Sequence, residues 1–180
     1  FWLLILGRGS RLTLATDKND GLFRALAIIE NAALILGRAG EILYTNPATM
    51  KILAYSPEDL LNQKVSLLFS SDGQSAEGLA FLDNLSAGKF QIHSDALELR
   101  AQSKEGYSVP VEVRLETLPI GGESRTLLVM KDLRRRKMNE ERLILLSSAV
   151  EQAPAGILIA DLKGVVEYVN DGFTKLTGYS

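Results

Sequence analysis

The chain has 180 residues, of which 46% are hydrophobic and 23% are charged, and its formal net charge is −2. This composition is typical of a globular domain with a hydrophobic core, and it argues against a nucleic-acid binder, whose phosphate contacts require an excess of Lys and Arg. The absence of cysteine excludes disulfides, Cys-ligated zinc, iron–sulfur clusters and thiol nucleophiles, and the single histidine, His93, excludes a His-rich metal site.

Residues 1–20 form an N-terminal segment before the first predicted domain. Residues 1–6 are apolar, but a bilayer takes roughly 20 residues to cross. Arg8 and Arg11 follow, as positive charges often follow a membrane helix on its cytoplasmic side. Two interpretations compete: the end of a membrane helix that starts upstream of Phe1, or a short element that packs on the domain. We expect a cytoplasmic protein, tethered to the inner membrane only under the first interpretation.

The first half of the chain predicts several helices and one hairpin. Asp20 is a suitable N-cap for an amphipathic helix, and Gly40 can take the positive φ that a hairpin turn requires. Asn46 with Pro47 suits the start of a helix, and Ser56-Pro57 starts another in the same way. The predicted elements are a helix near Leu22–Glu30, strands Ala33–Gly37 and Glu41–Thr45, a helix ending near Ala54, and a helix over Ser75–Leu85.

From Phe90 the apolar pattern changes to period two. The residues Val109, Val111, Val113 and Leu115 alternate with less apolar ones, which indicates a half-buried antiparallel strand. Gly106 suits the turn before this strand. The predicted strands are Ala96–Gln102, Val109–Leu118 and Thr126–Met130. Together with the first hairpin they predict an α+β domain, a five-stranded antiparallel sheet with helices on one face.

A linker helix is predicted over Leu133–Val150. Leu143, Leu146 and Val150 recur at spacings of three and four, as in the seam of a helix pair, which predicts a homodimer through this helix. The alternative is a solvated spacer helix. Two pairs of opposite charge are expected on its surface, Arg136 with Glu140 and Lys137 with Glu141.

A shift of 124 positions aligns residues 164–180 with residues 40–56 without a gap. Gly, Tyr, Asn, Lys, Tyr and Ser coincide in the two segments. The chain therefore holds two copies of one unit, and the second stops after about a third of its length. We expect the sequence to be cut from a longer protein. Because its apolar hairpin lacks covering strands, residues 156–180 are expected to be disordered, docked on the first copy or exchanged between chains.

These segments, in this order, resemble the PAS domain family, in which helices close over one face of a five-stranded antiparallel sheet. The run from Asp132 to Leu143 is similar to the family's exit signature, and residues 148–179 are similar to the opening of another such domain. The resemblance implies a first PAS domain over 21–132, a linker over 133–150 and a truncated second domain over 151–180. Its carrying residues are Gly40, Asn46-Pro47-Ala48, Ile52, Tyr55-Ser56-Pro57-Glu58, Leu60, Lys104-Glu105-Gly106 and Val109-Pro110-Val111-Glu112.

Two departures from the family pattern are visible. Arg134 and Arg135 replace the usual Thr and Glu of the exit signature. Thr49 and Ala54 stand where Phe and Gly are usual, and a Thr in place of Phe is expected to enlarge the first cavity.

The resemblance also implies an internal ligand cavity and a route from it to the linker. The candidate cavity residues are Ile35, Leu43, Met50, Leu53, Leu68, Leu82, Leu97, Val111, Val113, Leu127 and Val129. The candidate structural and coupling residues are Gly40, Asn46, Tyr55, Gly106, Asp132, Leu143, Leu146 and Val150. Each cavity candidate also fits an ordinary place in the core.

Cofactor chemistry is restricted by composition. A chain without cysteine cannot form the flavin adduct or the chromophore thioester that light-sensing PAS proteins use. Haem-binding relatives use an axial His on the helix before the long strands, whereas His93 is predicted to start a strand and to be an ordinary surface histidine. The cofactor is therefore unknown, and a non-covalently held flavin stays open.

We find no catalytic or metal-binding constellation in the sequence. Gly121-Gly122-Glu123-Ser124 superficially resembles the core motif of diguanylate cyclases but joins two strands as a turn. The resemblance implies a sensory module that binds a small ligand or a partner and couples it through the linker to an output domain, a histidine kinase or a cyclic-di-GMP enzyme. The alternative is a ligand-free module for dimerisation and spacing.

Overall fold

The computed structural model describes residues 17–90 and 96–179. His93, Trp2 and the apolar run at residues 1–6 lie outside the described residues. The chain divides into two compact units, one ending at Leu133 and one starting at Arg134, and each is described by itself. No helix among the described residues has both the length and the apolar character needed to cross a bilayer.

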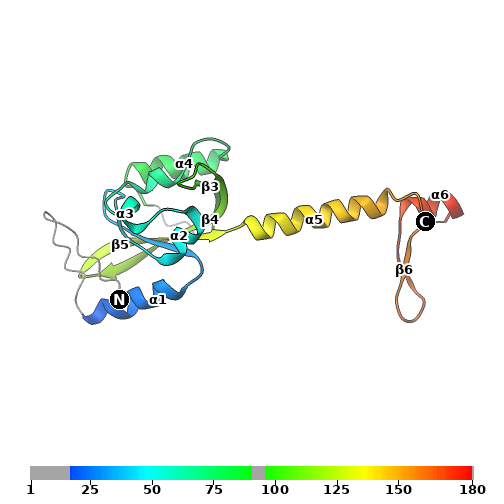
Figure 1. The fold of residues 1–180 in the computed structure, drawn as a ribbon, viewed down its shortest axis with the longest axis horizontal. Helices are drawn as coiled ribbons and strands as arrows, with labels where there is room; N and C mark the ends of the chain where they lie inside the picture. Colours follow the sequence, from blue (N-terminus) through cyan, green and yellow to red (C-terminus); the bar gives the residue numbers. More distant parts are fainter. Residues whose placement is uncertain (1–16, 91–95, 180) are drawn as a thin grey trace. The chain divides into compact units, whose positions relative to one another are not determined.

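The first unit is built on a five-stranded antiparallel sheet, as predicted (Figure 1). The strand order is β2-β1-β5-β4-β3, so the last strand of the first unit is the central strand of its sheet. Its strands are β1 (Ala32–Leu36), β2 (Ile42–Thr45), β3 (Leu97–Gln102), β4 (Ser108–Ile120) and β5 (Glu123–Asp132).

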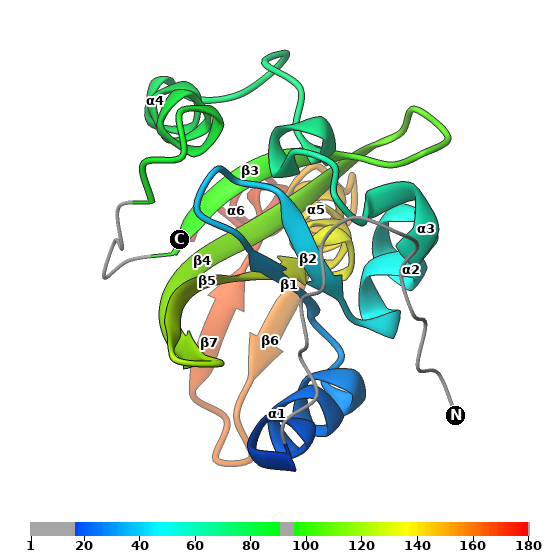
Figure 2. The ribbon, with the colours of Figure 1, turned by 90° about the vertical axis from the view of Figure 1, so that its left-hand side faces the viewer.

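Four helical segments cover one face of this sheet, and their apolar side chains join its main hydrophobic cluster. Contacts place α3 against β2 and α4 against β3. Because β2 and β3 are the two edge strands, the two helices lie toward opposite edges of the same face (Figure 2). The segments are α2 (Pro47–Leu53), α3 (Pro57–Leu60), the 3-10 helix η1 (Val65–Leu68) and α4 (Ala76–Ser86).

The first helix, α1 (Asp17–Ile28), packs on the other face of the sheet. Its Leu26 is buried in a second hydrophobic cluster with Ala33, Ile35 and Ile120. In Figure 1, α1 lies below the sheet and α4 above it. Strand β1 is therefore covered on both faces, which explains why all of its residues are buried and apolar.

The predicted cap of α1 is wrong. The helix starts at Asp17, so Asp20 lies within it, and the Asp20 carboxylate forms an i,i+4 ion pair with Arg24 at 2.9 Å.

The local signals at α2 and α3 are confirmed. The side chain of Asn46 accepts from the Thr49 N–H, and Pro47 is the first residue of α2. Ser56 and Asp59 form a reciprocal capping box at the start of α3, the arrangement that satisfies two free backbone donors. Gly40 has φ of 83°, which confirms the predicted turn.

The second unit repeats the start of the first. It consists of α5 (Arg134–Glu151), β6 (Leu158–Ala160), β7 (Val166–Val169) and α6 (Asp171–Thr177). The hairpin carries a register shift between Ile159 and Ala160, and β1 carries the same shift between Ile35 and Leu36, 124 positions earlier. Much of the apolar hairpin is exposed, Leu158 and Val166 included.

Helices α2 and α6 end in the same left-handed conformation on different residues. The terminal residue is Ala54 in α2, with φ of 61°, and Gly178 in α6, with φ of 77°. A Cβ atom makes this conformation unfavourable for any residue but glycine. Ala54 is therefore a strained departure from the residue that the second copy carries.

We expect Ala54→Gly to raise the free energy of unfolding of the first unit by roughly 1 kcal/mol, because glycine adopts this conformation without steric cost. Urea denaturation followed by circular dichroism measures the change. The matched control is Ala87→Gly, since Ala87 ends α4 with φ of −78° and carries no such strain. An Ala54→Gly variant no more stable than wild type would contradict this reading of the α2 terminus.

Candidate functional site

The candidate ligand site is the hydrophobic cluster between the sheet and helices α2 to α4. Six predicted cavity residues lie together in or against the main hydrophobic cluster there: Leu53, Leu68, Leu82, Leu97, Val111 and Val113. Val109 and Leu115 join them, which confirms the predicted alternation along β4. These side chains come from α2, η1, α4, β3 and β4, so the site is assembled from both layers.

The other five predicted cavity residues do not lie in this cluster. Ile35 and Leu127 belong to the cluster on the opposite face, under α1. Leu43 and Val129 are only partly buried and belong to neither cluster, and Met50 on α2 is 52% exposed.

In the strands, the predicted cavity residues are wrong by one position. Their neighbours Leu34, Leu36, Ile42, Leu128 and Met130 are the residues that face the helices. Because successive residues of a strand point to opposite faces, an error of one position moves a side chain to the other side of the sheet. In strands that are apolar on both sides, hydrophobicity alone does not identify the face.

The side chain of Asn46 joins three parts of the first unit. Its Nδ2 donates to the carbonyl oxygens of Leu26 in α1 and of Asn31, both at 2.9 Å. Its Oδ1 accepts from the N–H of Ala33, at 2.9 Å, and from the Thr49 hydroxyl, at 3.0 Å. Asn46 is 1% exposed, so its hydrogen bonds replace those that water would have made. It thus ties α1, β1 and α2 together.

Thr49 has a polar role in this arrangement. Its side chain is fully buried and its hydroxyl donates to Asn46, as no Phe side chain could do. The second copy has Phe173 at the equivalent position. Phe173 donates to the Asn170 side chain only through its backbone N–H. The substitution of Thr for Phe in the first copy therefore adds a hydrogen bond to the junction.

The turn between β3 and β4 holds the C-terminal end of α2. The N–H of Lys104 donates to the carbonyl oxygen of Leu53, at 2.9 Å. The Lys104 ammonium donates to both carboxylate oxygens of Asp59, at 2.8 and 2.7 Å. This hydrogen bond and those from Ser56 lower the pKa of Asp59 to about 2. Sequence reasoning predicted the helix start at Ser56-Pro57 but had no signal for the contact between Asp59 and Lys104.

The remaining coupling residues of the first unit are at the predicted places. Tyr55 packs against the main cluster, and Gly106 has φ of 87° in the turn between β3 and β4. Asp132 is the last residue of β5 and pairs with Val111 of β4. Leu133 follows it fully buried, and its N–H donates to the carbonyl oxygen of Pro110 at 2.9 Å. Helix α5 starts at the next residue.

The predicted seam on α5 is largely exposed in the chain. Leu143 is 67% and Leu146 53% exposed, whereas Val150 is partly buried at the end of the helix. The predicted ion pair between Arg136 and Glu140 is confirmed, with 2.8 Å between Nε and Oε1. Ile144 and Leu145 are exposed as well, so the apolar side chains of this part of α5 lie on more than one side of the helix.

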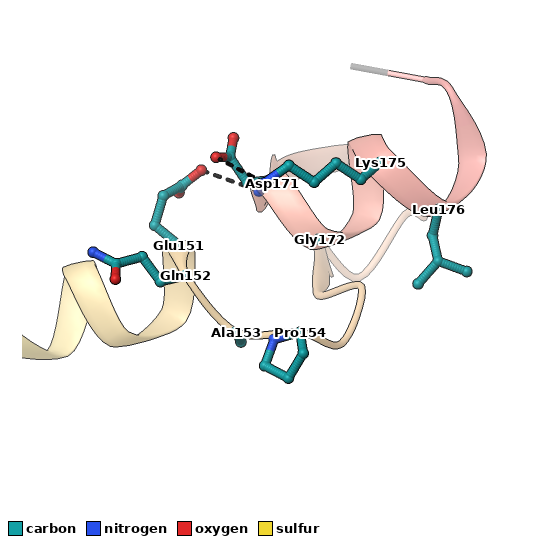
Figure 3. Close-up of a pocket in the computed structure, with 8 residues that line it drawn as sticks. All are labelled: Glu151, Gln152, Ala153, Pro154, Asp171, Gly172, Lys175 and Leu176. Atoms are coloured by element: carbon teal, nitrogen blue, oxygen red, sulfur yellow. Dashed lines mark hydrogen bonds and ion pairs between the residues drawn. The ribbon is translucent and has the colours of Figure 1, made fainter.

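A pocket of about 250 Å³ lies in the second unit, between the end of α5 and the start of α6 (Figure 3). Its charged residues are Glu151, Asp171 and Lys175, and they interact with one another: Glu151 accepts from the Asp171 N–H at 3.1 Å, and Lys175 lies 3.9 Å from the Asp171 carboxylate. Small-molecule sites are usually larger, ~300 Å³ or more, and less internally satisfied. The pocket therefore fits a gap where the end of α5 meets the start of α6 better than it fits a ligand site.

Comparison with known proteins agrees with this fold. A PAS domain family matches residues 30–135, and a PAS domain family also matches residues 144–180. The chain belongs to the PAS domain family. Similar folds among solved structures include the PAS domain of an HTR-like protein from Haloarcula marismortui, with 20% identity, a TM-score of 0.50, and coverage of 64% of this chain and 92% of that one.

Two similar curated proteins are from Escherichia coli. The oxygen sensor protein DosP is 24% identical over 94% of this chain and 21% of its own length. The signal transduction histidine-protein kinase AtoS is 30% identical over 84% of this chain and 24% of its own length. The chain thus spans less than a quarter of the length of each of these relatives. Both relatives are named for sensing or signal transduction.

We expect Asn46→Ala to lower the free energy of unfolding of the first unit by about 3 kcal/mol, because it removes the side-chain partner of the buried Leu26 carbonyl, the partly buried Asn31 carbonyl and the buried Ala33 N–H. Hydrogen exchange followed by mass spectrometry, read on peptides of β1 and β5, measures the loss. Asn170→Ala is the matched control, since the same side chain in the second unit should leave these peptides unchanged. Unaltered protection in Asn46→Ala would show that Asn46 does not organise the junction.

Proposed function

We propose that the chain is a sensory coupling module in which a small ligand or a protein contact at the first PAS domain changes the position of the helix that leaves it. The observation that carries the proposal is that β5 is the central strand and passes directly into α5. The family membership and the sensor and kinase names of the relatives support the same class of function.

The proposed transmission runs through β5. Leu128 and Met130 of this strand are fully buried among the side chains that α2, η1 and α4 place on the sheet. A ligand that repacks those helices must therefore act on β5 as well. Leu133 anchors the end of the strand in the first unit, so a displacement of β5 reaches the first turn of α5. The coupling can be no larger than the difference in ligand affinity between the two states.

The output and the assembly state are part of the proposal. We propose an output domain that follows in a longer protein, a histidine kinase or a cyclic-di-GMP enzyme, since one relative is named a histidine-protein kinase. We also propose that two chains pair through exposed apolar residues of α5, Leu143 and Leu146 among them. A pair of parallel helices converts a small movement of each helix into a change at the output domains.

The second candidate function is ligand-free dimerisation and spacing. It is favoured by the completeness of the core: Leu34, Leu36, Leu68, Leu128 and Met130 are all fully buried and in one cluster. A site already filled by its own side chains binds a ligand only if it can open. The two candidates therefore differ in whether the helices covering the sheet can be moved by a ligand.

We expect native mass spectrometry and thermal-shift assays over a panel of metabolites to identify a bound small molecule, and we expect that molecule to change hydrogen exchange in α5. Leu68→Ala should weaken its binding at least tenfold, because Leu68 is fully buried in the cluster. Leu67→Ala is the control, since its side chain is 48% exposed. A panel without any bound species or thermal shift, together with dimers in the native spectra, would favour the spacing function.

A further inference from the structure

In each copy, an equivalent asparagine forms a hydrogen bond to the helix that precedes the copy. In the first unit, Asn46 Nδ2 donates to the carbonyl oxygen of Leu26 in α1 at 2.9 Å. In the second unit, Asn170 Nδ2 donates to the carbonyl oxygen of Val150 in α5, also at 2.9 Å. Both pairs are related by the shift of 124 positions. The last turns of α5 therefore have the same relation to the second copy that α1 has to the first.

The second copy adds a carboxylate to this junction. Glu151 Oε2 accepts a hydrogen bond from the hydroxyl of Tyr168 in β7. Glu151 Oε1 accepts from the N–H of Asp171 at the start of α6, at 3.1 Å (Figure 3). Hydrogen bonds to an ionised carboxylate are stronger than those between neutral groups. The two oxygens of one side chain thus join α5, β7 and α6.

The first copy lacks this carboxylate. Ala27 occupies the position equivalent to Glu151. The equivalent tyrosine, Tyr44, donates instead to the carbonyl oxygen of Phe23, at a long 3.4 Å. Its ring also packs on Phe23, with 5.0 Å between ring centroids. Both helices thus share the asparagine bond, but α1 adds mainly apolar packing, whereas α5 adds the two hydrogen bonds of Glu151.

We propose that Glu151 is a clasp that fastens the end of α5 to the second PAS copy, so that the helix and the second copy move as one body. The pKa of Glu151 is lowered, chiefly by the hydrogen bond from Tyr168, as expected for a carboxylate held in its ionised form. Glu151 acts as a positioning residue. The inference deepens the proposed function and rests on its assignment of α5 as the transmitting element: the clasp is where movement of α5 passes into the second copy.

The absence of cysteine allows an unambiguous test. Nitroxide labels are attached to Arg142→Cys on α5 and to Leu162→Cys at the fully exposed tip of the hairpin, and pulsed electron paramagnetic resonance measures the distribution of the distance between them. In the wild-type background we expect one narrow distribution. We expect Glu151→Ala to broaden it at least twofold and Tyr168→Phe to broaden it less, because that change removes a single oxygen.

Three controls complete the experiment. Tyr44→Phe, the matched change in the first copy, should leave the distribution unchanged. Hydrogen exchange of β6 and β7 shows whether the hairpin is still formed, and Tyr168→Phe keeps the test decisive if Glu151→Ala disrupts it. Equal widths in wild type, Glu151→Ala and Tyr168→Phe would overturn the clasp. No ligand is involved, so a failed ligand search bears on the proposed function and leaves this result standing.

Discussion

The structure depends on one strand, β5, which pairs with β1 on one side and β4 on the other. It is also covered on both faces, because Leu128 and Met130 pack under the helices while Leu127 packs against the cluster that contains α1. A central strand of this kind cannot shift without disturbing two neighbouring strands and two layers of side chains. The proposed function assigns the coupling to this strand because α5 begins two residues after its end.

The second constraint on the structure is the junction between each copy and its preceding helix. In both copies the residue at this junction is an asparagine. A side-chain amide offers two N–H donors and an oxygen with two acceptor sites. Asn46 uses its two donors on carbonyl groups of α1 and the following loop, and its oxygen on β1 and α2. Neither Asp nor Leu can reproduce both functions in a buried place. Equivalent contacts surround Asn170, so the two copies share this hydrogen-bond pattern as well as their sequence.

The sequence predicted those elements whose signals are local. Asn46-Pro47 and Ser56-Pro57 combine a cap with a proline, so the starts of α2 and α3 could be placed correctly. The alternation along β4 survives because one of its faces is polar. In β1 and β5 both faces are apolar, so the pattern could not say whether Ile35 or Leu36, or Leu127 or Leu128, faces the helices.

The residues of the candidate site could be predicted from the sequence only where one face of an element is polar. Six of the cavity candidates lie together because they come from amphipathic helices or from strands with a polar face, whereas Met50 was placed inside although it lies on the exposed side of α2. Contacts between distant polar residues gave no sequence signal. The bond between Lys104 and Asp59, and the one between Glu151 and Tyr168, each join residues whose proximity only the fold creates.

Hydrogen exchange in a pair of neighbouring variants, Leu128→Ala and Leu127→Ala, tests the transmission through β5 most directly. Leu128 is fully buried under the helices, and Leu127 faces the other way. The account predicts that the space left by Leu128→Ala speeds exchange in β5 and also in the first two turns of α5, from Arg134 onward, while Leu127→Ala affects α5 much less. Faster exchange in β5 with α5 unchanged in both variants would contradict it.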